Sequence, residues 1–403
     1  MGKRLTLWIG IGVVAGFLYG ALWPNFVAPL DFFGELFLAL LKMIVVPLVA
    51  VSVFLGVASL ESLRRLRDLG IKTFLYYLGT TSLAVLTGLV LVNVIRPGVG
   101  VALAPAGTPT PLPQAEGLGL RDFLLRLIPT NPIQSLAQGD ILPIIVFSLL
   151  LGAAVIPVRD REPVVRVFRG LNDAILTLTG WIMWLAPVGV MGLVAAVVAE
   201  KGLAVLLPIF KYAATVVLGL LIHSLITLPL MLAILGHQSA LWLFHRVKGA
   251  LAVAFSTASS SATLPVTLEA METEARVRPE VAGFVLPLGA TVNMDGTALY
   301  EAVAALFIAQ AYGIPLSLPA QAVVFLTATL AAIGAAGIPS AGLVTMTIVL
   351  KAVGLPLEGI GLILAVDRFL DMLRTTVNVW GDCIGAALVD RWVRRQENRL
   401  APS

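Results

Sequence analysis

The chain has 403 residues, of which 59% are hydrophobic and only 12% are charged, and its mean hydropathy is +0.97. Soluble domains carry about 25% charged residues. Together with repeated apolar runs of membrane-spanning length, this composition predicts an all-α polytopic membrane protein and argues against a soluble enzyme. The net charge of +4 does not indicate nucleic-acid binding. The basic residues lie in short clusters between apolar runs, as the positive-inside rule produces.

The N-terminus and the cysteine content bound the compartment. The first residues, MGKRLTLWIGIGVVAGFLYGALW, combine a basic start with an apolar run. Because many apolar segments follow, we expect an uncleaved first span rather than a signal peptide. The single cysteine, Cys383, excludes an internal disulfide and a cysteine-based metal site. The chain has no Asn-x-Ser/Thr sequon, which favours a prokaryotic plasma (inner) membrane.

The first half of the chain predicts ordinary membrane spans, followed by a proline- and glycine-rich loop at 96–119 after the third. The second span is long enough to tilt, and the fifth should bend at Pro187. The expected spans are Leu5–Trp23, Phe33–Leu60, Phe74–Ile95, Ile141–Ile156, Val167–Val198 and Pro208–Leu235.

Basic loops set the orientation. The loops after the second and fourth spans and the C-terminal tail are the basic ones, so we place them and both termini in the cytoplasm. The residues concerned are Arg64, Arg65, Arg67 and Lys72; Arg159, Arg161, Arg166 and Arg169; and Arg391, Arg394, Arg395 and Arg399.

The apolar runs in the second half of the chain are interrupted by short polar or glycine-rich segments. Residues 240–272 are interrupted by STASSSATLP, Val281–Ala311 by NMDGT, and 318–352 by GAAGIPSAG, before a last segment at Leu355–Val393. Two half-length pairs, each followed by a polar-bearing helix, suggest an inverted internal repeat. Non-helical backbone at membrane depth is tolerated only where it is buried or lines a cavity. Paired interruptions of this kind point to a transporter's binding site.

The last segment contains DRFLDMLRTTVNVWGD, at 367–382. On a helix that advances about 100° per residue, its polar residues share one stripe. Each charge at a bilayer centre costs roughly 2.5–3.5 kcal/mol, so the stripe needs partners or ligands. A guanidinium binds a carboxylate through paired hydrogen bonds, and a carboxylate holds an ammonium group. Arg374 with Asp371 therefore predicts a receptor for a zwitterion whose side chain is also acidic.

These motifs together resemble the glutamate transporter family, the dicarboxylate/amino acid:cation symporters that include the excitatory amino acid transporters. The serine-rich hairpin, NMDGT, GIP in the second hairpin and D-x3-D-x2-RT-x2-NV-x-GD follow in family order over essentially the whole chain. The resemblance implies eight transmembrane helices plus two re-entrant hairpins, and an elevator-type symporter that forms a homotrimer.

The resemblance also implies a substrate site. Arg374 would pair with the substrate's side-chain carboxylate and Asp371 with its amino group, while Ile338 to Gly342 would form a lid. The other expected substrate contacts are Ser259, Ser260, Thr297, Thr375 and Asn378.

It implies cation sites as well, with Na⁺ and/or H⁺ as coupling ions, no organic cofactor and no catalytic residue. One site would use Asp382 with carbonyls of Gly289, Asn293 and Asn378. Another would use Asp295 and Asn293 with Thr80, Thr81 and the Tyr77 carbonyl. A third would use the Thr291 carbonyl and carbonyls of Ala332, Ile333 and Ala335. Glu301 lies where proton-coupled members carry glutamate and is a candidate proton carrier.

One position departs from some archaeal relatives, which carry an arginine just before the serine run. Here that residue is Ala258, and Arg368 beside Asp367 is expected to supply the missing charge. The implied division of the chain is 1–71 (scaffold helices 1–2), 72–95 (helix 3, moving with the transport core), 96–207 (loop and scaffold helices 4–5), 208–236 (helix 6), 237–395 (transport core) and 396–403 (tail).

The motif favours L-aspartate or L-glutamate as substrate, with C4-dicarboxylates or neutral amino acids as alternatives. An aspartyl intramembrane protease needs aspartates on separate helices, whereas Asp371 and Asp382 share one; no GxSxG motif supports a serine protease. Broken helices could also form a channel filter, but a two-point amino-acid site is superfluous for conduction.

Each feature has a structural alternative. The stripe could be an internal salt-bridge ladder, the serines could be small packing residues, and Asp295 could cap a kinked helix. Glu301 could be a structural acid, and Thr80 and Thr81 could bond back to their own helix. His223, His237 and His245 lack metal-ligand spacing, so we assign them no site.

Overall fold

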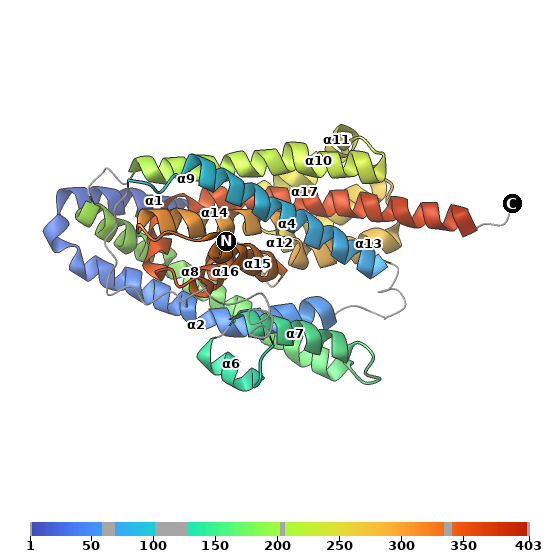
Figure 1. The fold of residues 1–403 in the computed structure, drawn as a ribbon, viewed down its shortest axis with the longest axis horizontal. Coiled ribbons are helices and arrows are strands. Elements are labelled where there is room, and N and C mark those ends of the chain that lie inside the picture. The colour runs from blue at the N-terminus through green and yellow to red at the C-terminus, as the bar shows by residue number, and fades with distance from the viewer. Residues whose placement is uncertain are drawn as a thin grey trace.

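The computed structural model describes residues 2–58, 69–100, 128–139, 141–201, 206–333 and 341–400, and every regular element in those ranges is helical. The long helices run roughly along one axis of an elongated bundle (Figure 1). Most of the loop predicted at 96–119 and the centre of the second hairpin break lie outside the described residues.

The N-terminal helices are α1 (Gly2–Leu22), η1 (Pro24–Phe26), α2 (Ala28–Ala58), α6 (Pro132–Gln138), α7 (Ile141–Val155) and α8 (Glu162–Lys201). Of these, α1 and α2 pack mainly on α8, while α7 packs on α2 and α6 packs on α7. Glycines let α1 approach α8 closely: a Cβ at Gly16 would lie 2.6 Å from the Met191 carbonyl oxygen, and one at Gly20 would lie 2.5 Å from that of Ala195. Small residues at such spacing are typical of tightly packed membrane helices.

The predicted bend in α8 is present. The segments Glu162–Ile182 and Trp184–Ala196 meet at 49°. The break falls four residues before Pro187, where a proline ring clashes with the preceding turn and removes a backbone hydrogen bond.

Two further helices flank the C-terminal half. The first is α4 (Ile71–Ile95), which packs against α14 and α9. The second is the run α9 (Leu206–Ile222), η4 (His223–Thr227), α10 (Leu228–Met231) and η5 (Leu232–Gly236), in which η4 and η5 are π-helical turns. π-Helical turns inside α-helices occur frequently at functional sites.

The C-terminal half is built from the interrupted helices that the sequence predicts. The elements are α11 (Ala240–Thr257), α12 (Ser260–Glu269), η6 (Ala270–Glu274), α13 (Pro279–Val292), α14 (Asp295–Ala311), α15 (Leu318–Ile333), α16 (Ala341–Ala352), η7 (Leu357–Gly359) and α17 (Ile360–Leu400). Ala258 ends α11 in the left-handed region, with φ of 50°, and Ser259 caps α12 by accepting a hydrogen bond from the Ala262 amide. Asn293 and Met294 of the NMDGT motif separate α13 from α14, and the rest of the motif begins α14.

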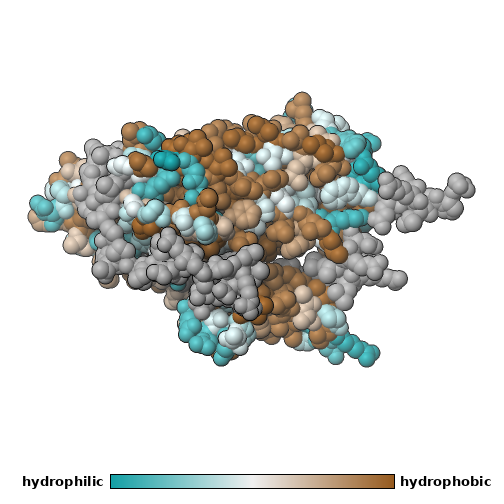
Figure 2. Space-filling view, viewed as in Figure 1, coloured by the Kyte–Doolittle hydropathy of each residue, from teal (hydrophilic) through white to brown (hydrophobic). Residues whose placement is uncertain are grey.

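The outer surface is suited to lipid. Hydrophobic residues dominate the visible face along α9 and α10, and the most hydrophilic residues lie mainly toward the ends of the molecule (Figure 2). Large apolar side chains such as Phe210, Leu225 and Ile234 are mostly exposed there. An apolar surface of this kind is abnormal for a soluble monomer and is expected where lipid covers the protein.

By length and apolar composition, two helices among the described residues are long enough to cross a membrane, Ile71–Ile95 and Leu207–Gly236, and the bent pair in α8 makes a third. The charged stripe lowers the apolarity of α17, and α15 and α16 are of less than spanning length. The predicted total of eight spans therefore remains a prediction.

Candidate substrate and cation site

The site lies between α14 and α17 in the interior of the bundle. From Asp295 to Ala309 every residue of α14 is buried, and so is the polar stripe of α17, including Arg374 at 0% exposure. Buried polar groups must be hydrogen-bonded and buried charges must be paired. The contacts of these residues therefore define the chemistry of the site.

Arg374 is held in a cage of opposite charge and aromatic surface. Its Nη1 lies 3.1 Å from Asp367 Oδ1 and its Nη2 lies 2.8 Å from Asp371 Oδ1. Its Cζ lies 3.7 Å from the centre of the Tyr300 ring, a cation–π arrangement. A second cation, Arg368, places Nη1 3.5 Å from Asp371 Oδ2. Asp371 thus contacts both arginines, and Asp367 pairs with Arg374 rather than serving only as a partner for Arg368.

The second hairpin covers the guanidinium through Gly342. A Cβ at this glycine would lie 3.3 Å from Arg374 Cζ and 3.3 Å from the Thr297 methyl carbon, so only glycine fits without displacement. One turn further along α16, the Thr345 hydroxyl donates to Glu301 Oε1, while Glu301 Oε2 has no hydrogen-bond partner among the described residues. Gly342 and Thr345 therefore connect the second hairpin to both Arg374 and Glu301.

Asn378 joins α17 to the start of α14. Its Oδ1 accepts a 2.8 Å hydrogen bond from the Gly296 amide, and its Nδ2 lies 3.3 Å from Thr297 Oγ1. Gly296 packs directly on the α17 backbone, because an added Cβ would lie 2.7 Å from the Arg374 carbonyl oxygen. Thr375 is buried on the same helix. The NMDGT motif and the α17 stripe thus form a single unit.

Two buried carboxylates, Asp295 and Asp382, define an oxygen-rich region next to the arginine cage. Asn293 Nδ2 donates to Asp382 Oδ1 at 2.9 Å and lies 3.4 Å from the Asn378 carbonyl oxygen. The Thr81 hydroxyl donates to Asp295 Oδ1 at 2.7 Å. Gly289 packs against the Asp382 carboxylate. Carboxylate, amide, hydroxyl and carbonyl oxygens are the donors that hard cations such as Na⁺ prefer.

Thr80 lies at the same place. Its hydroxyl donates to the Tyr77 carbonyl at 3.1 Å and lies 3.5 Å from Asn293 Oδ1. The described residues contain no cluster of three or more His, Cys, Asp or Glu side chains suited to a metal ion.

The remaining predicted residues lie at the two hairpins, except Thr291, which lies near the end of α13. Ser260 is buried at the first position of α12, a helix that packs against α13 and α17. Thr291 is exposed and its hydroxyl bonds back to the Leu288 carbonyl. Ala332 and Ile333 are buried at the end of α15. Ala335 and Ile338 lie outside the described residues.

Sequence reasoning missed His223, which was set aside because it lacks metal-ligand spacing. Its Nε2 lies 3.1 Å from Asp295 Oδ2, and both side chains are fully buried. The available signal was an ionisable residue inside an apolar span, which by default marks a functional site. Tyr300 and Thr345 were missed because neither differs, in sequence, from an ordinary helix residue.

A helical membrane protein with a caged arginine, buried carboxylates and interrupted helices at one site belongs to the class of secondary transporters. The profile of the sodium:dicarboxylate symporter family matches residues 5–392. The chain belongs to this family and is a transporter, not an enzyme.

Three relatives show the range of the family. The chain is 37% identical to the proton/glutamate-aspartate symporter of Escherichia coli (strain K12), over 91% of this chain and 86% of the relative. It is 35% identical to the proton/sodium-glutamate symport protein of Bacillus caldotenax, over 95% and 93%. It is also 37% identical to the neutral amino acid transporter B(0) of Bos taurus, over 97% and 78%. Overall identity alone therefore does not separate acidic from neutral substrates.

Proposed function

We propose that this protein is a secondary active symporter that imports acidic amino acids, L-aspartate or L-glutamate, together with Na⁺ and/or H⁺. The observation that carries the proposal is the fully buried Arg374, held by Asp367 and Asp371 beside the oxygen-rich region of Asp295 and Asp382. A neutral amino acid has no side-chain carboxylate that could pair with this buried guanidinium. The relatives named for glutamate and aspartate transport support the same substrate class.

In this proposal the substrate replaces part of the arginine cage. The side-chain carboxylate of the amino acid takes the guanidinium hydrogen bond that Asp371 now accepts, while Asp367 stays paired with Arg374. Asp371, released from Arg374, then accepts the substrate ammonium group and stays neutralised by Arg368. Each exchange conserves a buried ion pair, which avoids the cost of an unpaired charge in the interior. Ser259, Ser260, Thr375 and Asn378 hold the backbone groups of the substrate, and Thr297 lies near its side-chain carboxylate.

The coupling ions occupy the oxygen-rich region. Asp382 with Asn293, Asn378 and Gly289 forms one cation site, and Asp295 with Thr80, Thr81 and Asn293 forms another. Glu301 is the candidate proton carrier, supported by its burial and its hydrogen bond to Thr345 of the second hairpin. A negative carboxylate at each site needs a cation before the second hairpin closes over it, and this requirement links ion binding to substrate transport.

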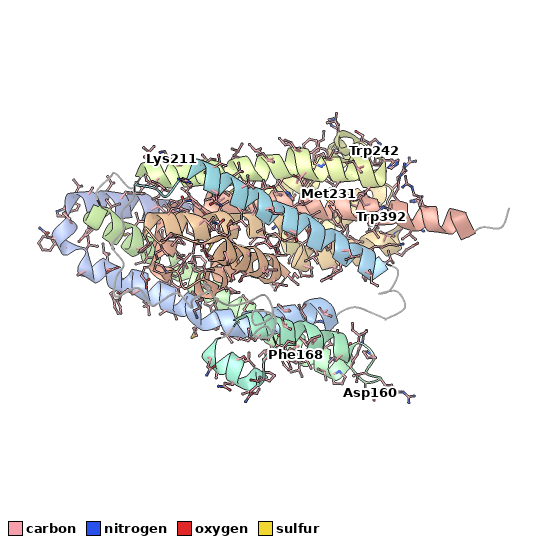
Figure 3. All side chains as sticks on the ribbon, in the orientation of Figure 1. Asp160, Phe168, Lys211, Met231, Trp242 and Trp392 are labelled. Atoms are coloured by element: carbon pink, nitrogen blue, oxygen red, sulfur yellow. The ribbon has the colours of Figure 1, made fainter. Side chains whose placement is uncertain are left out.

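The larger-scale features of the proposal rest on family membership. The transport core comprises 237–395 together with the predicted third and sixth spans, 72–95 and 208–236. It moves as an elevator against a trimeric scaffold. The protein is a multi-pass inner-membrane protein with both termini in the cytoplasm. Asp160 of the basic loop and Trp392 near the tail lie toward the same end of the molecule, and Lys211 lies toward the other (Figure 3), which supports placing this loop and the tail on one side of the membrane.

Uptake into liposomes tests the function. Purified protein should accumulate labelled L-aspartate or L-glutamate under an inward Na⁺ gradient, an inward proton gradient, or both, each applied separately. Labelled L-alanine and succinate under the same gradients test the neutral and C4-dicarboxylate alternatives. If folded protein accumulates no acidic amino acid under either gradient, the proposal is wrong.

A further inference from the structure

A histidine on α9–η4 contacts the cation region from outside the predicted ligand set. His223 Nε2 lies 3.1 Å from Asp295 Oδ2, while the Thr81 hydroxyl donates to the other oxygen, Oδ1, at 2.7 Å. The carboxylate is thus held from two sides, by α4 and by the sixth span. All three side chains are buried, with His223 and Asp295 at 0% exposure.

His223 lies at the start of a π-helical turn that also contacts α17. His223 is the first residue of the π-helical turn η4, where the extra residue per turn changes the direction of the following side chains. The same turn is tied to α17, because Trp380 Nε1 donates to the Ser224 carbonyl at 3.1 Å. Trp380 lies next to Gly381, whose added Cβ would meet Asn293 Nδ2 at 2.7 Å. The turn, α17 and the cation region therefore form a continuous packed unit.

The hydrogen-bond pattern indicates which imidazole nitrogen carries the proton. His223 Nδ1 has no hydrogen-bond partner among the described residues. A buried N–H without an acceptor is costly, whereas an N–H donated to a carboxylate is favourable. The pattern therefore places a proton on Nε2, which is donated to Asp295 Oδ2. A carboxylate that accepts a hydrogen bond on each oxygen is held in one orientation, and its remaining lone pairs stay available to a cation.

We propose that His223 is a positioning residue for a Na⁺ site at Asp295: its Nε2–H fixes the carboxylate in the orientation that binds the ion. His223 does not itself bind the ion in this arrangement. Outer-shell partners that orient a ligand typically contribute 10–100-fold to metal affinity. The inference rests on the proposed function for its biological meaning, but it concerns ion binding and is tested without transport.

The test compares three replacements of His223. His223→Gln carries an amide N–H as many bonds from the backbone as Nε2 and should retain the hydrogen bond. His223→Asn is polar but too short to reach Asp295, and His223→Leu is apolar. His245→Asn, at an exposed position on α11, is the matched control. For each purified protein, the unfolding temperature is measured against Na⁺ concentration, with choline chloride at equal ionic strength as the reference.

Na⁺ should stabilise the wild type, His223→Gln and His245→Asn over similar concentration ranges. His223→Asn and His223→Leu should need roughly tenfold or more Na⁺ for the same stabilisation. If His223→Leu does not fold, the inference is judged from the Na⁺ dependence of the unfolding temperature of His223→Gln against that of His223→Asn. The inference is overturned if Na⁺ does not stabilise the wild type, or if His223→Asn responds to Na⁺ as the wild type does.

Liposome uptake then separates this inference from the proposed function. In the Asn variant the half-saturating Na⁺ concentration should rise, while the KM for aspartate at saturating Na⁺ stays near the wild-type value, because His223 does not contact the arginine cage. A general packing defect would instead lower the maximal rate in all conditions. Absence of wild-type uptake would contradict the proposed function but leave the Na⁺ stabilisation result standing.

Discussion

At the scale of single residues, the charge pairs of α17 are the defining feature. Helical periodicity alone places Asp367, Asp371 and Arg374 on one face, so their proximity could be predicted from the sequence. The cation–π contact with Tyr300 and the approach of Gly342 could not, because they depend on how α14 and α16 pack against α17. The sequence therefore predicted the charged residues around Arg374 but not the contacts that Tyr300 and Gly342 make with it.

Replacing Arg374 by Cys should abolish uptake of acidic amino acids and permit uptake of small neutral ones, because the buried cation that pairs with the substrate carboxylate is lost. Arg374→Lys keeps the charge but loses the two-point geometry and should lower acidic uptake without admitting neutral substrates. Breaking a buried ion pair costs about 3–5 kcal/mol, so thermal unfolding must show that each variant is folded. Unaltered acidic uptake by a folded Arg374→Cys protein would refute the role given to Arg374.

Gly342→Ala should raise the KM for acidic substrates, because the added methyl would press on Arg374 and Thr297. Mild crowding of this kind costs about 1 kcal/mol, equivalent to roughly fivefold in KM. Gly79→Ala on α4 is the control, since nothing lies within 4 Å of an added Cβ there. Equal KM values for the two alanine variants would show that Gly342 does not set the packing of the binding site.

At the scale of elements, the breaks between helices test the sequence-based predictions more sharply than the helices themselves. The serine run and NMDGT break helices where the sequence predicts, at residues 258–259 and 293–294. Serine and asparagine favour such breaks because their side chains form local hydrogen bonds that compete with a continued helix. The π-helical turn at His223 had no comparable signal, since it lies in a continuous apolar run. The turn contacts Asp295 and Trp380, which are distant in the sequence, and periodicity cannot reveal such contacts.

The α1–α8 contact gives a prediction at this scale. Gly16→Ala should lower the unfolding temperature by several degrees, because its methyl would overlap the Met191 carbonyl of α8. Gly10→Ala should be neutral or slightly stabilising, since no atom lies within 4 Å of its added Cβ. Measurements in detergent with a fluorescent reporter suffice. Equal unfolding temperatures for both variants would mean that α1 is not clamped to α8 as described.

At the scale of the whole molecule, the transporter class, the helical fold and the half-length hairpins were predictable from hydropathy and its interruptions. The number of spans and the trimer remain predictions. Composition alone does not identify α17 as a span, since its charges lower its apolarity, and a single chain contains no evidence of its neighbours.

Orientation can be tested with introduced cysteines, because the native Cys383 is buried. A membrane-impermeant maleimide applied to intact cells should label Leu318→Cys, whose native side chain is 81% exposed at the start of α15. It should label Asp160→Cys only after permeabilisation, since the basic loop is predicted to face the cytoplasm. The opposite labelling pattern would invert the proposed topology.

The central claim is that one buried site binds an acidic amino acid and cations together. Calorimetric titration of the purified protein with L-aspartate at several Na⁺ concentrations and pH values tests it most directly. Linkage requires that the Kd fall as the coupling ion is raised, by roughly tenfold for each 1.4 kcal/mol of coupling. The account predicts such a fall with Na⁺, with protons, or with both, and no measurable binding to Arg374→Cys. A Kd that is independent of both ions, or unchanged in that variant, would contradict it.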